Sequence, residues 1–197
     1  MVPRAAQVHG QPSDEQSGTH RRTGIDYNSL NAAEIAQGLR VNYDAIAGRP
    51  NQIEYQVDPG STQREVQTDR GFARDSSTLG AQATDADYTN TGYDKGHLAQ
   101  REAFKGDGHV ERAADLMTNV VPMTVALNRG EGSPWRAAEA ETIRWADQYG
   151  GVQVKVTPIY DANPPKLPSG IPIPKAIHRK VVAADGQVLQ DLTFLNR

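Results

Sequence analysis

The sequence predicts an α+β domain with an antiparallel sheet, because segments with strand periodicity lie on both sides of one strong amphipathic helix. Apolar and polar residues alternate over residues 53–57 and again over 152–156. Between them, residues 135–149 carry apolar side chains at helical spacing. Strands, then a helix, then strands is an order typical of α+β folds rather than of alternating βα units.

The sequence of the N-terminal part of the chain predicts a leader, followed by the start of the domain. Residues 1–28 are rich in Gln, Ser, Gly, His and Arg and have no apolar periodicity, which indicates a flexible leader ahead of a single domain over 29–197. Asn31 and Glu34 then fit a capping box. Apolar residues follow at helical spacing, so a short helix is predicted up to about Arg40.

A half-buried strand is predicted next, where Ile53, Tyr55 and Val57 alternate with polar residues. A Pro-Gly turn follows, so we expect this strand to form a hairpin with a second one near residues 64–68. Residues 70–92 are polar and rich in Gly, Ser, Thr and Asp, which is typical of loop.

The long helix has clear start and stop signals. Ser133 is a good N-cap and Pro134 suits the first helical position, while Gly150 and Gly151 end the helix. A strand over 152–156 comes next. A proline-rich connection leads to a last hairpin around Asp185-Gly186, with residues 176–182 and 188–194 as its arms.

Length and composition exclude several classes of protein. A chain of 197 residues suits one domain, and the absence of cysteine excludes a disulfide framework, a thiolate metal site and a thiol nucleophile. No apolar run is long enough for a transmembrane helix, so no membrane partner is expected, and the N-terminus lacks the apolar stretch of a signal peptide. A net charge of −3 argues against a basic coat that holds nucleic acid passively. The acidic excess lies in residues 51–94, where a basic partner could bind.

The first cluster of residues suited to catalysis is Asp94-Lys95-Gly96-His97. We expect Gly96 to permit a tight turn that holds His97 at a fixed angle. Imidazole titrates near neutrality and can therefore accept a proton from water. Lys95 supplies a cation for a phosphate. The alternative is a surface turn with an incidental histidine.

Two asparagines, Asn119 and Asn128, follow within apolar surroundings. Their side chains offer neutral hard oxygens, which suit a Mg²⁺ ion that keeps most of its waters. Asparagines in loops are more often turn formers, and that interpretation stays open.

The third candidate is Glu139, which shares one face of the long helix with Trp135, Thr142 and Ala146. Trp135 and Ala146 indicate that this face points inward. A carboxylate beside apolar surface is costly unless it is paired, hydrogen-bonded or near a metal. A glutamate that reaches solvent at the edge of the apolar face is the alternative.

These three elements together resemble a known family. The runs YDKGHLA, TNVVPM and LNRGEGSPWRAAE, between residues 93 and 139, resemble the motifs of the DNA/RNA non-specific endonucleases, which are ββα-metal (His-Me finger) nucleases. The resemblance implies a ββα-metal core. It also implies metal-dependent hydrolysis of phosphodiester bonds in DNA, RNA or both, with little sequence preference.

By position, the resemblance implies a role for each matched residue. His97 would be the general base, and Asn128 the one direct protein ligand of a hydrated Mg²⁺, with Mn²⁺ as an alternative. Glu139 would bind the water shell of that metal. Asn119 would support the site through hydrogen bonds, and Asp94 would help to fix the turn.

Two features depart from the family pattern. Lys95 stands where the family usually has arginine, which keeps the charge but loses bidentate phosphate geometry. Extra residues between Gly130 and Trp135 lengthen the loop before the helix. These departures give weight to an alternative function, a non-catalytic nucleic-acid-binding or interaction domain on the same scaffold.

The chain layout and the resemblance also predict a biological setting. A polar leader ahead of one nuclease domain looks like the toxin module of a secreted bacterial effector. Such a module would be exported by a specialised system or as part of a larger chain and would act in the cytoplasm of a target cell. It would also need a cognate immunity or inhibitor protein. A stand-alone extracellular nuclease is the alternative.

Overall fold

The fold combines two antiparallel sheets with a few helices, in a computed structural model that describes residues 38–63, 71–105 and 107–197. The larger sheet has the strand order β1-β2-β5-β6-β7 and the smaller one pairs β3 with β4. The strands of the larger sheet are β1 Arg40–Asp44, β2 Arg49–Val57, β5 Val152–Ile159, β6 Ala176–Ala183 and β7 Val188–Leu195. Those of the smaller sheet are β3 Tyr93–His97 and β4 Val120–Thr124. Every strand pair is antiparallel, which confirms the α+β class.

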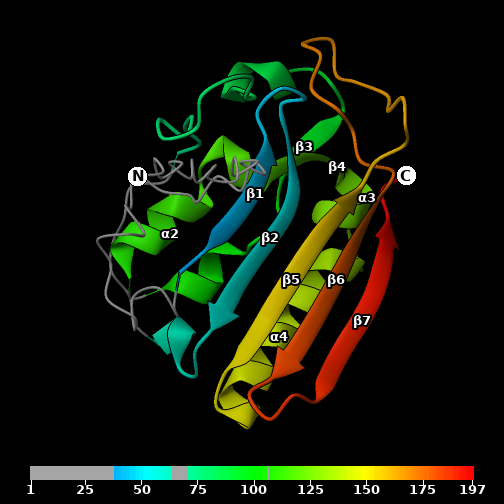
Figure 1. Cartoon of the computed structure of the whole chain (residues 1–197). Coiled ribbons are helices and arrows are strands. Elements are labelled where there is room, and N and C mark those ends of the chain that lie inside the picture. The colour runs from blue at the N-terminus through cyan, green and yellow to red at the C-terminus, as the bar shows by residue number, and fades with distance from the viewer. Residues whose placement is uncertain (1–37, 64–70, 106) are drawn as a thin grey trace, which may run out of the picture.

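One long helix, α4 (Pro134–Tyr149), covers a face of the larger sheet, and in Figure 1 it lies behind β5 and β6. The shorter helices are α2 Gly108–Ala114, α3 Val125–Asn128 and the 3₁₀ helices η1 Ser61–Gln63, η2 Asp85–Tyr88, η3 Arg101–Phe104 and η4 Met117–Asn119. Within the described ranges, no helix combines the length and the apolar character needed to cross a membrane.

The start and stop signals predicted for α4 are confirmed. The Ser133 hydroxyl accepts a hydrogen bond from the backbone N–H of Arg136 at 3.2 Å, and Gly150 ends the helix with a φ of 73°. The buried residues of α4 face the sheet, and the Trp135 ring packs edge-on against Phe194 with the ring centroids 5.4 Å apart. The helix is therefore anchored by its apolar face, and its register determines where Glu139 lies.

The strands predicted after α4 are also confirmed. Val152, Val154 and Val156 are buried in β5, and the last hairpin is formed by β6 and β7. Before α4, the strand over 53–57 is confirmed as part of β2, whose neighbours in the sheet are β1 and β5. The second strand predicted near 64–68 lies outside the described residues, as does the leader over 1–28.

The prediction of a helix that ends near Arg40 is wrong at that end, because Arg40 begins β1. Leu39, Val41 and Tyr43 are buried and alternate with more exposed residues, which is strand periodicity. Pairing with β2 makes these residues part of the main core. The remainder of the predicted helix, residues 31–37, lies outside the described residues.

Gly96 does not form the tight turn that was predicted, since it lies inside β3 and is not among the glycines with positive φ. Its small size is needed for another reason. A Cβ atom at this position would lie 2.5 Å from Cβ of Met123 on β4, which is far inside van der Waals contact. Gly96 therefore lets β3 and the side chain of Met123 approach closely, directly beside His97 in the strand. Asp94 likewise lies in a strand rather than in a turn.

Candidate active site

A cleft of about 410 Å³ opens where β3, η3, α3 and α4 meet. Two of the three runs that carry the sequence motifs contribute side chains to it: the first supplies His97, and the third supplies Asn128 and Glu139. The residues that line the cleft are Gly71, Phe72, His97, Gln100, Arg101, Glu102, Asp115, Asn128 and Glu139. The structure thus brings His97, Asn128 and Glu139 together around one space.

The smaller sheet and α4 place these three side chains. His97 ends β3 and pairs with Val120 at the start of β4. The chain leaves β4 directly into α3, a single helical turn that ends at Asn128. Glu139 comes from the second turn of α4. Strand β3, the short helix α3 and the long helix α4 therefore each supply one residue of the set.

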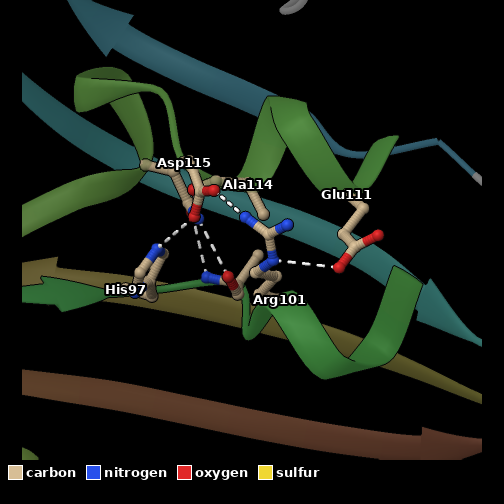
Figure 2. Close-up of polar contacts among 7 residues, drawn as sticks. His97, Arg101, Glu111, Ala114 and Asp115 are labelled. Carbon is tan, nitrogen blue, oxygen red and sulfur yellow. Dashed lines mark hydrogen bonds and ion pairs between the residues drawn. The ribbon is translucent and has the colours of Figure 1, made fainter. Parts of the chain in front are cut away.

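His97 has a carboxylate partner that the sequence motifs did not reveal. Its Nε2 atom lies 3.1 Å from Oδ1 of Asp115, the residue that follows α2 (Figure 2). The side chain of His97 is 25% exposed and that of Asp115 is 10% exposed, so the imidazole is accessible from the cleft while its partner is enclosed. The Phe72 ring lies 5.1 Å from the imidazole, measured between ring centroids.

Arg101 lies between two buried carboxylates (Figure 2). Its Nε atom donates to Oε1 of Glu111 at 2.9 Å, and its Nη1 atom donates to Oδ2 of Asp115. Each oxygen of Asp115 therefore has its own partner, His97 on one side and Arg101 on the other. A buried carboxylate with a guanidinium partner avoids the cost of an uncompensated charge.

Asn128 is oriented by Asp94. Oδ2 of Asp94 accepts hydrogen bonds from Nδ2 of Asn128 at 3.1 Å and from Nε of Arg129 at 2.8 Å. Burial raises the pKa of Asp94, but the bonds from Arg129 and Asn128 outweigh this effect and hold the pKa below its ordinary value. Because Asp94 takes the amide nitrogen, the carbonyl oxygen of Asn128 is the atom left for a cation.

Glu139 is a carboxylate in a poorly solvated position. Burial raises its pKa to about 7, against the attraction of the Arg179 guanidinium, which lowers the pKa. The neighbouring Glu102 raises the pKa further. A divalent cation in the cleft would reverse this balance, because it favours the ionised form of Glu139.

Asn119 and Lys95 do not line the cleft. The amide of Asn119 is fully buried, and its three hydrogen bonds, to the backbone of Ala99 and Ala114, are each 2.9 Å long. Asn119 thus holds the segment after His97 against the end of α2. Lys95 forms an ion pair with Asp85, and its Nζ atom lies 4.5 Å from the centroid of the Phe72 ring.

The residues present fit a hydrated divalent metal ion. Asn128 offers a neutral oxygen and Glu139 an anionic one, both hard donors of the kind that Mg²⁺ prefers. Among the described residues, no three or more His, Cys, Asp or Glu side chains form a group that could enclose an ion. A metal held here would therefore keep most of its coordination sphere as water.

The raised pKa of Glu139 predicts how stability depends on pH in the metal-free protein. The folded state holds a proton on Glu139 up to about pH 7, whereas the ordinary pKa of a glutamate is 4.5. The folded state thus binds more protons between these values, so the free energy of unfolding falls as pH rises through this window. Urea denaturation with chelator present, at several pH values, measures the fall. Glu139→Gln should flatten it, and an equal slope in both proteins would contradict the prediction.

Two antiparallel strands with a histidine, followed by a helix that carries a carboxylate, with an asparagine between them, are the arrangement of the ββα-metal nucleases. The family model for DNA/RNA non-specific endonucleases matches residues 16–195. The chain therefore belongs to this family of metal-dependent nucleases and is an endonuclease.

Comparison with solved structures supports the same fold. The chain is similar to a structure described as the EndoG/EndoGI complex, solved to explain how EndoG is inhibited. The TM-score is 0.70 at 19% sequence identity, over 86% of this chain and 81% of the other. No curated protein sequence matches the chain.

Proposed function

We propose that this endonuclease hydrolyses phosphodiester bonds in DNA, RNA or both, with Mg²⁺ or Mn²⁺ and with little sequence preference. The observation that carries the proposal is the single cleft lined by His97, Asn128 and Glu139. The sugar-phosphate backbone is common to all sequences, so a site built to act on it discriminates poorly between them.

In this proposal each side chain has a distinct task. His97 accepts a proton from the water that attacks phosphorus. Asn128 and Glu139 hold the metal and its water shell, and Asp94 keeps the Asn128 amide turned so that its carbonyl oxygen faces the ion. When bound, the metal supplies Lewis-acid polarisation of the phosphate and offsets negative charge on the leaving oxygen.

Digestion of plasmid, single-stranded DNA and RNA tests this proposal. We expect cleavage with Mg²⁺ or Mn²⁺ and none with an excess of chelator, because without the ion the site has no cation to offset charge at the phosphate. Restoring the metal should restore cleavage. Substrates that stay intact under every metal condition, or cleavage that is equally fast in chelator, would count against it.

We propose further that the chain is the toxin module of a secreted effector, delivered by specialised export or within a larger protein, and that a cognate inhibitor protein restrains it. The EndoG of the similar solved structure is bound by the protein EndoGI. That complex supports the idea that a nuclease of this fold can be blocked by a protein. Expression in a host without the inhibitor should be toxic, and His97→Ala should remove the toxicity. Equal growth with both forms would contradict the toxin role.

A further inference from the structure

We propose that Asp115 is a positioning residue that fixes the tautomer of His97, and that Arg101 in turn keeps Asp115 as a pure hydrogen-bond acceptor. The proposal rests on the proposed function, in which His97 is the general base. It adds that Arg101 on η3 and Asp115 at the end of α2 together determine which imidazole nitrogen is free to accept the proton.

The hydrogen-bond geometry leaves one consistent arrangement of protons. Nε2 of His97 lies 3.1 Å from Oδ1 of Asp115, while Arg101 donates to Oδ2 of the same carboxylate. An ionised carboxylate has only acceptor atoms, so Nε2 must carry the proton. The lone pair of the neutral ring is then on Nδ1. Nδ1 is therefore the atom that takes the proton from water.

The surrounding charges support an ionised Asp115. Arg101 cannot lose its proton in a protein and is itself held on its other side by Glu111, 2.9 Å from Nε. Among the described residues, Asp115 contacts the guanidinium of Arg101 and the imidazole of His97. The carboxylate of Glu111 lies beyond Arg101, and Glu102 lines the same cleft. When His97 becomes an imidazolium, Asp115 stabilises the new charge without taking up a proton.

Asp115→Asn would reverse this arrangement of protons with almost no change in the shape of the side chain. Its amide has one acceptor atom, whereas Asp115 serves two donors. Arg101 can only donate, so it takes the amide oxygen, and the amide NH₂ then faces Nε2. Nε2 must now accept, which moves the ring proton to Nδ1. The base would be lost although the imidazole stays in place.

Nitrogen-15 NMR of the ring nitrogens, recorded above the pH at which the His97 signals stop shifting, tests the proposal directly. The His97 signals are assigned by comparison with His97→Gln. We expect the Nε2–H tautomer in the wild-type protein and the Nδ1–H tautomer in Asp115→Asn. Cleavage by Asp115→Asn should fall by roughly 10²–10⁴-fold.

Asp191→Asn is the matched control. Asp191 also lies beside a histidine, with Oδ1 2.7 Å from Nε2 of His178, and neither residue lines the cleft. The tautomer of His97 and the rate should stay close to wild type. An Nδ1–H tautomer in the wild-type protein, or an unchanged tautomer in Asp115→Asn, would overturn the proposal. A wild-type protein with the expected tautomer but no cleavage would instead refute the proposed function.

Discussion

Replacement of His97 by alanine is expected to reduce cleavage by at least about 10²–10⁴-fold, the usual contribution of a general base. The variant removes the group that accepts the proton from the attacking water but leaves Asn128 and Glu139 in the cleft. Metal binding should therefore survive. Single-turnover digestion of a defined duplex measures the rate, and circular dichroism checks that the fold is intact.

His178→Ala provides a matched control, because His178 also has an aspartate partner, with Nε2 2.7 Å from Oδ1 of Asp191. It lies on β6 and does not line the cleft. Its replacement should leave the rate nearly unchanged. If His97→Ala cleaves as fast as His178→Ala, His97 is not the base.

Asn128→Ala is expected to lose both metal binding and cleavage, the latter by roughly 10²-fold or more, because the variant removes the neutral oxygen that would contact the ion directly. Oδ2 of Asp94 accepts from Asn128 and from Arg129, so the variant leaves Arg129 as the remaining donor of the two. Calorimetric titration with Mn²⁺ measures the affinity, and the duplex assay measures the rate.

Asn51→Ala is the control for Asn128, since Asn51 is exposed and bonds only weakly to Asn42, at 3.3 Å. We expect wild-type metal affinity and rate from it. Unchanged Mn²⁺ affinity in Asn128→Ala would remove Asn128 from the metal site, even if cleavage were slower.

The parts of the fold that could be predicted are those whose signals are local. Ser133, Pro134 and Gly150 mark both ends of α4, and Trp135 and Ala146 show which face is buried, so Glu139 could be placed near the core from sequence. The strand β1 could not be placed, because a helix-capping pattern just before it competes with a short alternating stretch. Pairing with β2, which is a tertiary contact, decides in favour of the strand at Arg40.

In the candidate site, too, local motifs could be predicted from the sequence, whereas tertiary contacts could not. The motifs identified His97, Asn119, Asn128 and Glu139 as a set. The structure places all of them except Asn119 around one cleft. Asp115 carries no motif signal, because its contact with His97 depends on how α2 packs beside η3. Gly96 was identified for a backbone turn, whereas the close approach of Met123, visible only once β3 and β4 pair, explains the glycine.

A crystal structure of the protein grown with Mn²⁺ tests the metal site most directly, because the anomalous scattering of Mn²⁺ locates the ion. We expect an anomalous peak in the cleft next to Oδ1 of Asn128. Water molecules of the ion should be hydrogen-bonded to Glu139, and His97 should face the same space. A peak elsewhere on the molecule, with none beside Asn128 at saturating Mn²⁺, would contradict it.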